Sequence, residues 1–317
     1  MNILIISFTV SFFALIALLK TNLASIALDA PNDRSLHTVL TPRTGGLAIM
    51  LGVLASFALL GGLWAWIGFV LALMLISLVD DISGLTVRWR LALQVLLCAG
   101  FVWFFMLGQP WWLKLLALPA LVWMTNLYNF MDGSDGLAGG MAVFGFGAYA
   151  IAAYLGQNLP LAIMCSAVAA SSFAFLIFNF YPAKIFMGDA GSIPLGFLAG
   201  SIGLYGWQLR LWPFWFSIIV FSPFIVDATV TLFKRGLRGE KVWQAHREHY
   251  YQRLVQMGWG HKKTALAEYI LMFSIAICAL AILKLHSLGV LLLLLLWLFI
   301  YSFIMITIDK KWHKRLP

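Results

Sequence analysis

The chain has 317 residues, of which only 10% are charged and 62% are hydrophobic, and its mean hydropathy is +0.94. This composition excludes a disordered chain. It also argues against a soluble globular enzyme, because an ordinary soluble domain carries about 25% charged residues to cover its surface. The bilayer is therefore the solvent that the composition fits. The net charge of +9 is typical of loops that face anionic lipid and does not by itself indicate nucleic acid.

Apolar runs along the chain predict the membrane spans, since a transmembrane helix needs about 20 predominantly apolar residues. We count eleven runs, or ten if one of the short or glycine-containing runs is discounted. They cover 3–19, 45–60, 63–79, 91–107, 111–130, 137–155, 161–180, 193–206, 212–233, 265–283 and 290–308. Alternating segments of about ten residues, as in a β-barrel, are not seen. The predicted fold is all-α, a polytopic membrane helix bundle that forms a single domain over residues 1–317.

The loops between these spans divide into two sets when they are assigned alternately to the two sides of the membrane. One set carries nearly all of the Lys and Arg: 31–43, 80–90, 131–136, 181–191, 234–263 and 309–317. The positive-inside rule makes this set cytoplasmic and leaves the N-terminus outside. All 12 acidic residues fall on the same half, and we therefore expect the functional site on the cytoplasmic loops.

Two sequence blocks place carboxylates where an apolar span ends. Asp80 and Asp81 end the third span, as a solvated helix end or as a site for Mg²⁺ or a cation-bound phosphate. In the block NLYNFMDGSDG, polar residues recur at every third position, so on a helix they form one stripe that ends in a glycine-rich turn. An ordinary turn is the alternative to nucleotide recognition with metal or phosphate positioning. The stripe consists of Asn126, Asn129, Asp132 and Asp135.

A third block, FNFYPAKIFMGDAGS, follows the seventh span. In it, Asp189 between two glycines suits a cation, Lys184 suits a phosphate and Phe186 suits stacking on a base. A structural re-entrant loop is the alternative. The first cytoplasmic loop adds two candidate phosphate ligands, Arg34 and Arg43, although positive-inside anchoring also explains arginines there.

The longest loop contains the block HREHYYQR. His246 and His249 share a helix face, but no third zinc ligand stands nearby, so we favour phosphate and sugar contacts by these histidines and Arg253. Asp227 lies inside the ninth span, four residues after Pro223, where a bend is expected. An acid at that depth is usually functional or paired, and its candidate partners are Lys234 and Arg235.

Taken in order, the blocks PNDRSLH, PRTGG, DDISGL, NLYNFMDGSDGLAGG, FNFYPAKIFMGDAGS and HREHYYQRL resemble those of the polyprenyl-phosphate N-acetylhexosamine-1-phosphate transferases. The resemblance implies a UDP-N-acetylhexosamine and undecaprenyl phosphate as substrates in a bacterial inner membrane. It also implies Mg²⁺ as the cofactor, with Mn²⁺ as a candidate substitute. The further partner expected is membrane lipid, with no nucleic acid, and a homodimer is left open.

The resemblance also implies roles for individual residues. Asp80 and Asp81 match the acid pair linked to the lipid phosphate and to catalysis, and Asp189 matches the acid linked to Mg²⁺. We expect Asp80, Asp81 or Asp132 to support the metal. The remaining matches are to substrate contacts: Asn129, Asp132 and Asp135 in the NxxDGxDG pattern, Asn179 and Phe186 at the uridine pocket, and His37 with the first-loop arginines.

Three alternatives remain beside this interpretation. A phospho-MurNAc-pentapeptide transferase is disfavoured because that group has a triple histidine where this chain has His246-x-x-His249, and an enzyme that initiates O-antigen is favoured instead. A secondary transporter would place its ionisable groups near the midplane and often shows internal repeats, neither of which is found. A scaffold protein would not need the polar stripe. The reaction itself can be a single displacement or pass through a phospho-aspartate.

Overall fold

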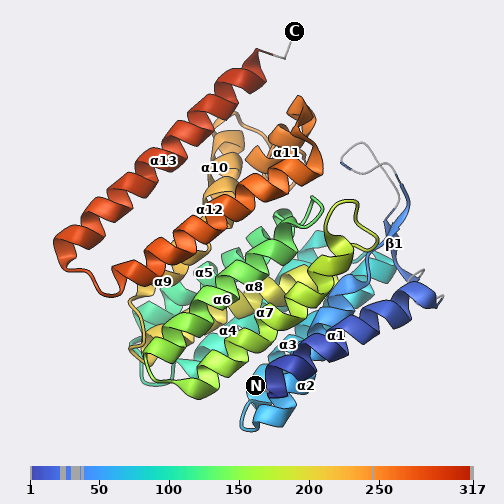
Figure 1. Cartoon of the computed structure of the whole chain (residues 1–317), viewed down its shortest axis with the longest axis vertical. Helices are drawn as coiled ribbons and strands as arrows, with labels where there is room; N and C mark the ends of the chain where they lie inside the picture. The colour runs from blue at the N-terminus through green and yellow to red at the C-terminus, as the bar shows by residue number, and fades with distance from the viewer. Residues whose placement is uncertain (1, 22–25, 30–35, 37–38, 245, 315–317) are drawn as a thin grey trace.

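Figure 1 shows the computed structural model of the chain, which describes residues 2–21, 26–29, 36, 39–244 and 246–314. Helices dominate these residues, beside one short pair of strands. The elements are α1 (Asn2–Lys20), β1 (Leu28–Asp29), β2 (Thr41–Pro42), α2 (Gly45–Leu60), α3 (Trp64–Ser83), α4 (Val87–Phe105), α5 (Trp111–Phe130), α6 (Leu137–Leu155), α7 (Leu159–Asn179), α8 (Asp189–Gln208), α9 (Phe214–Val220), α10 (Ser222–Leu237), α11 (Tyr250–Leu254), η2 (Val255–Trp259), α12 (Gly260–Ile282) and α13 (Ser287–His313).

Ten of the eleven predicted spans fall on one helix each and the ninth falls on the bent pair of α9 and α10, which confirms the all-α membrane class. In the described part of the chain, seven helices are long and apolar enough to cross a membrane, and the bent pair of α9 and α10 adds an eighth. The 16-residue α2 is shorter. The helices α5 and α8, with 20 residues each, are long enough to cross a membrane but are less apolar than these seven. Because α8 is buried along most of its length, its small and polar residues face other helices.

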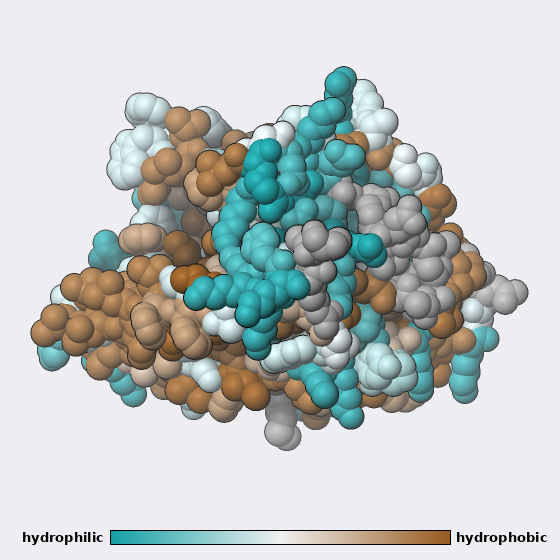
Figure 2. Space-filling view, turned by 90° about the horizontal axis from the view of Figure 1, so that it is seen from above, coloured by the Kyte–Doolittle hydropathy of each residue, from teal (hydrophilic) through white to brown (hydrophobic). Residues whose placement is uncertain are grey.

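The helices form one bundle with α8 in its interior. α8 packs on α3 and α5, α6 packs on α7, and α1 packs on α2 and α7. By contrast, α13 lies at the outer edge of the bundle (Figure 1), and only Ile308 of this helix is buried. Seen from the end that carries the longer loops, hydrophilic residues gather in a central band with hydrophobic residues on both flanks (Figure 2). Such flanks suit contact with lipid chains.

The ninth predicted span is broken. α9 and α10 meet at an angle of 80°, and Pro223 lies in the first turn of α10. Proline has no backbone N–H to donate and is tolerated only at the start of a helix, so it favours a break at this position. The bend expected near Pro223 is confirmed.

Two sequence blocks far apart in the chain are joined by backbone hydrogen bonds. Phe186 N donates to Pro42 O at 2.7 Å, Gly45 N donates to Phe186 O at 2.9 Å and Gly46 N donates to Met187 O at 2.8 Å. A side chain at Gly46 would collide with the backbone of Gly191, so this contact requires glycine. The close approach places the PRTGG block against the MGDAGS block at one end of the bundle.

Candidate functional site

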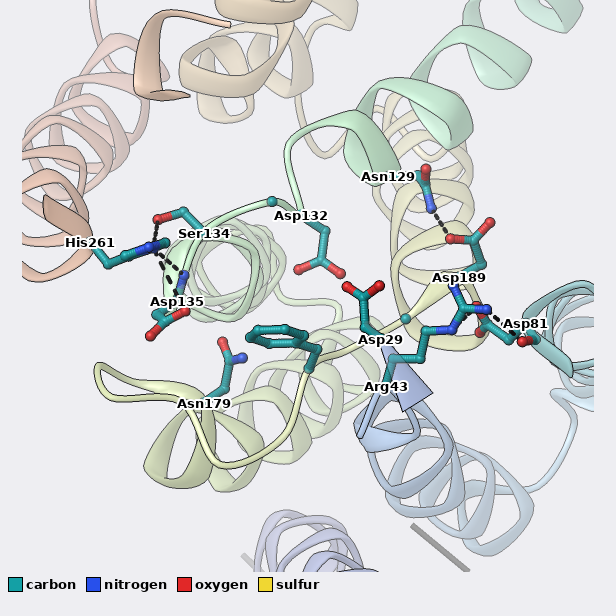
Figure 3. A pocket seen from close by; sticks show the side chains of 13 residues that line it. Asp29, Arg43, Asp81, Asn129, Asp132, Ser134, Asp135, Asn179, Asp189 and His261 are labelled. Atoms are coloured by element: carbon teal, nitrogen blue, oxygen red, sulfur yellow. Dashed lines mark hydrogen bonds and ion pairs between the residues drawn. The ribbon is translucent and has the colours of Figure 1, made fainter. Parts of the chain in front are cut away.

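A polar cavity of about 150 Å³ lies at the end of the bundle where these blocks meet. Its lining comes from the first loop, the end of α3, the α5–α6 turn, the α7–α8 loop and the start of α12 (Figure 3). The lining residues are Asp29, Arg43, Asp81, Asn129, Asp132, Gly133, Ser134, Asp135, Asn179, Phe186, Gly188, Asp189 and His261. Segments separated by more than 200 positions in the sequence therefore build one site.

One side of the cavity is acidic. α3 continues past its predicted end, so Asp81 lies in its last turn, and α8 begins at Asp189. Asp81 Oδ2 accepts a hydrogen bond from Ala190 N at 3.1 Å, and Arg43 Nε lies 3.5 Å from Asp81 Oδ1. Asp189 Oδ1 accepts from Asn129 Nδ2 at 2.7 Å. These contacts hold both carboxylates at the cavity wall.

Asp80 has a different position from its neighbour. Its Oδ2 accepts from Arg90 Nη1 at 2.8 Å and its Oδ1 accepts from Leu85 N at 2.7 Å. The same Arg90 nitrogen lies 3.2 Å from Asp189 Oδ2, so this guanidinium bridges two acids. Asp80 is not among the residues that line the cavity. It reaches the site only through Arg90.

Asp132 stands in the turn after α5, facing the other acids (Figure 3). Desolvation and the negative charges of Asp189, Asp81 and Asp29 raise the pKa of this carboxyl well above its usual range. Burial is the larger cause of this shift, and repulsion from the neighbouring carboxylates adds to it. A divalent cation would relieve that repulsion.

The carboxylates of the cavity suit an Mg²⁺ ion that takes only part of its ligands from the protein. Within the described ranges, no group of three or more His, Cys, Asp or Glu side chains is arranged to hold a metal by itself. Mg²⁺ commonly takes only one or two carboxylates and completes its octahedron with water and substrate phosphates. Asp189 and Asp81, which are held on one wall with Asp132 facing them, suit such a partly open site.

The other side of the cavity is held by hydrogen bonds between side chains and the backbone. Asn179 Oδ1 accepts from Gly136 N at 2.9 Å, and its Nδ2 donates to Ile185 O at 2.9 Å. Asp135 Oδ2 accepts from Ala183 N at 3.0 Å. Gly136 has a φ of +77°, which a residue with a side chain rarely adopts. The hydrogen bonds of Asn179 and Asp135 thus shape a pocket beside Phe186, which also lines the cavity.

Several residues proposed from the sequence lie away from the cavity. Asn126 Nδ2 donates to Val122 O of its own helix at 2.8 Å, and the side chain of Lys184 is exposed. Neither is among the lining residues. Arg34 and His37 lie outside the described residues.

The long-loop residues also serve local contacts. Arg253 is buried and donates to Asp309 Oδ1 at 2.8 Å. His249 Nδ1 lies 3.3 Å from Asp227 Oδ1, and the His246 ring lies 4.7 Å from that of His249. Burial and the neighbouring His249 lower the pKa of His246 to about 3, so it is neutral at pH 7. None of the three histidine and arginine side chains lines the cavity.

The partners proposed for Asp227 are wrong. Its two oxygens accept from the backbone N–H groups of Tyr250 and Tyr251, at 2.9 and 3.0 Å. Lys234 instead bonds Tyr250 and Asp309, and Arg235 bonds Glu240. The reason is geometric, because the start of α11 turns its free amides toward α10 and a carboxylate satisfies them best.

Four residues at the site were not predicted from the sequence. Asp29, Ser134 and His261 line the cavity, and Arg90 bridges its acids. Ser134 lies inside a block already singled out, so its position was a usable signal. Asp29 and His261 stand alone in the sequence, with no spacing that connects them to the other blocks.

Comparison with known proteins identifies the family of the chain. The sequence profile of glycosyl transferase family 4 matches residues 63–206. The chain is 30% identical over 279 residues to the probable undecaprenyl-phosphate N-acetylglucosaminyl 1-phosphate transferase of Bacillus subtilis, covering 81% of this chain and 77% of that protein. It is 31% identical over 312 residues to the decaprenyl-phosphate N-acetylglucosaminephosphotransferase of Mycobacterium leprae, covering 82% and 78%. These matches establish that the chain belongs to glycosyl transferase family 4, the polyprenyl-phosphate N-acetylhexosamine-1-phosphate transferases, as its motif blocks predict.

Proposed function

We propose that this transferase moves the sugar-1-phosphate of a UDP-N-acetylhexosamine to undecaprenyl phosphate. An oxygen of the lipid phosphate attacks the sugar-bearing phosphorus, the pyrophosphate bond to the uridine side breaks, and UMP leaves. The observation that carries the proposal is the single cavity in which acids that suit Mg²⁺ face a pocket formed by Asn179 and Phe186. The names of the bacterial and mycobacterial relatives favour N-acetylglucosamine as the sugar.

Residues of the acidic wall supply binding and orientation in this proposal. Asp189 and Asp81 are the ligands that we assign to Mg²⁺, with support from Asp132. When bound, Mg²⁺ would neutralise the pyrophosphate oxygens and improve UMP as a leaving group. Arg43 lies beside Asp81 at the cavity and suits a phosphate oxygen. A general base contributes little, because a phosphate monoester has its second pKa near 6 and is already mostly dianionic at pH 7.

The prenyl chain of the acceptor lipid needs an apolar site within the same helix bundle. A second cavity of about 520 Å³ lies between α5, α8 and the broken pair of α9 and α10. Its walls are almost wholly apolar, and they include Leu121, Met124, Gly200, Phe214 and Phe221. We assign the prenyl chain to this groove. The bend between α9 and α10 supports the assignment, because it opens space beside α5 that a straight helix would fill.

The apolar helices and the polar cavity also bear on where the enzyme lies in the cell. We infer that the enzyme is a multi-pass protein of the bacterial inner membrane with the cavity on the cytoplasmic side, where the nucleotide sugar is available. In Figure 1, α1 starts at the end of the bundle opposite to β1, which supports an N-terminus on the outer side. The product would start a cell-envelope polysaccharide, for which O-antigen is the candidate.

A radiolabel assay tests the proposal. Purified protein is incubated with undecaprenyl phosphate, Mg²⁺ and a panel of UDP-sugars that includes UDP-MurNAc-pentapeptide. We expect a lipid-linked product with a UDP-HexNAc and loss of that product with EDTA. Absence of product with every UDP-HexNAc would overturn the proposal. A labelled phospho-enzyme trapped from UDP-sugar alone would replace the single displacement by the two-step route.

A further inference from the structure

His261 joins three segments at the rim of the cavity. It lies in the first turn of α12, and its ring stacks on that of Tyr181 with centroids 6.1 Å apart and an angle of 10° between the planes. Nδ1 lies 2.9 Å from Ser134 Oγ and 3.4 Å from Asp135 N, and Nε2 lies 3.2 Å from Leu36 O. A single side chain thus links the first loop, the α5–α6 turn and α12.

These contacts give the two ring nitrogens different hydrogen-bond roles. A carbonyl oxygen only accepts, so Nε2 carries the proton and donates to Leu36 O. Nδ1 therefore has a free lone pair, which accepts from the N–H of Asp135 and from the hydroxyl of Ser134. The two nitrogens of His261 thus have distinct tasks, with Nε2 as a donor and Nδ1 as an acceptor, and Asp135 Oδ1 lies 3.7 Å from Nδ1.

Nδ1 of His261 holds the Ser134–Asp135 turn from one side, and contacts with α7 and the α7–α8 loop hold it from the other. Asp135 Oδ2 accepts from Ala183 N, and Gly136 N donates to Asn179 Oδ1. His261 supplies the opposite support at Ser134 and Asp135. Among the described residues of the long loop 234–263, it is also the one that lines the cavity. Figure 3 places this group across the cavity from Asp81 and Asp189, away from the acidic wall.

We propose that His261 is a positioning residue for the nucleotide sugar, acting through the lone pair of Nδ1 on the Ser134–Asp135 turn. This inference rests on the proposed function, since it assigns the side of the cavity opposite the acidic wall to the donor substrate. The acidic wall does not depend on this contact. Loss of His261 should therefore weaken binding of the donor and leave the transfer step nearly intact.

Two conservative variants separate the tasks of the two nitrogens. In H261N the side-chain oxygen replaces Nδ1 as an acceptor, whereas in H261Q the amide nitrogen replaces Nε2 as a donor. We expect H261A to raise KM for UDP-HexNAc about tenfold, the effect of one or two lost hydrogen bonds, with kcat within about twofold of wild type. H261N should recover most of the loss and H261Q should not. H313N, at an exposed histidine of α13, is the matched control and should behave as wild type.

Hydrogen exchange at the amides of residues 134–136, measured in detergent without substrate, gives a readout that does not need transfer. H261A should exchange faster there than wild type and H261N should not. Unchanged exchange in H261A would overturn the positioning role, even if no UDP-sugar were a substrate. A fall in kcat with KM unchanged would also overturn it, while the proposed function would stand. Recovery by H261Q in place of H261N would assign the role to Nε2 and reject our inference.

Discussion

At the scale of single residues, adjacent carboxylates have separate environments. Asp81 faces the cavity beside Asp189, while Asp80 is held by Arg90 and by the amide of Leu85. The pair ends one helix, and consecutive residues on a helix point about 100° apart, so only one of them can face a given wall. Their contributions should therefore be separable by substitution.

Asp81→Asn should lower kcat by about 10²- to 10³-fold, as expected for loss of a charge that stabilises phosphoryl transfer. Asp80→Asn should cost less, about tenfold, because it releases Arg90 but leaves both cavity carboxylates in place. Initial rates at saturating concentrations of both substrates measure the difference. Equal losses in the two variants would contradict the assignment of Asp81 to the cavity.

Asp189→Asn should weaken binding of the divalent cation and reduce transfer by about 10²- to 10³-fold. The reason is that the carboxylate opposite Asp132 supplies the charge that the ion needs. Paramagnetic Mn²⁺ bound to the purified protein can be counted directly, without transfer. Glu240→Gln, which removes the same charge from the distant α10–α11 loop, is the control. Unchanged Mn²⁺ affinity in the Asp189 variant would reject its role as a ligand.

At the scale of elements, the α10–α11 connection is fixed by a buried acid. Asp227 of α10 accepts the amides of Tyr250 and Tyr251, and the Tyr251 hydroxyl donates to Phe130 O at 3.1 Å. The same hydroxyl packs on Gly133 of the α5–α6 turn, where a side chain would collide with it. Asp227 therefore supports the turn that carries Asp132.

Asp227→Asn should destabilise the protein by about 1–3 kcal/mol, because an amide replaces charge-assisted acceptors of two buried N–H groups. The apparent melting temperature in detergent should fall by several degrees. Thr307→Ala, which removes one hydroxyl contact to the backbone of its own helix, should leave it nearly unchanged. A melting temperature equal to wild type for the Asp227 variant would mean that the start of α11 is held by other contacts.

The apolar groove between α5, α8 and α9 is testable at the same scale. Ala120 lines it and is exposed, so Ala120→Trp should fill part of the groove. We expect KM for undecaprenyl phosphate to rise about tenfold and KM for the nucleotide sugar to stay constant. Ala281→Trp, at an exposed alanine of α12 outside the groove, is the matched control. An equal effect of both variants would argue against this groove as the prenyl site.

At the scale of the whole molecule, the cavity and its acids lie at the end of the bundle that carries the β1–β2 pair. The α12–α13 turn lies at the other end (Figure 1). Reaction at the cytoplasmic face is consistent with a phosphate at headgroup depth and a nucleotide sugar from the cytosol. The central hydrophilic band in Figure 2 marks the same end. The proposed function therefore predicts that the end of the bundle with the cavity faces the cytoplasm.

Ser83 ends α3 two residues after the cavity-lining Asp81, whereas Ser287 begins α13 at the α12–α13 turn. Both serines are exposed, and cysteine is close to isosteric with serine. A membrane-impermeant maleimide should label Ser287→Cys in intact spheroplasts and Ser83→Cys only after permeabilisation. The native cysteines Cys98 and Cys165 are buried and Cys278 is half-buried, and the parent protein gives their background. Labelling of Ser83→Cys from outside would reverse the proposed orientation.

The membrane class, the positions of most helices and the family could be predicted from the amino-acid sequence, because hydropathy and short motifs are local properties of the chain. The sequence also identified most of the cavity-lining residues, since Asp81, Asn129, Asp132, Asp135, Asn179, Phe186 and Asp189 lie within the motif blocks.

Which of the adjacent acids Asp80 and Asp81 faces the cavity, and which distant residues line it, depends on how the helices pack. Ser134 and His261 meet across 127 positions, and no helical period or charge count predicts that contact. The same holds for His249 and Arg253, whose motif suggested a substrate. Their partners are Asp227 and Asp309, which come from other helices. A buried polar group is satisfied by whatever the packing brings within hydrogen-bond distance, and packing depends on the whole chain.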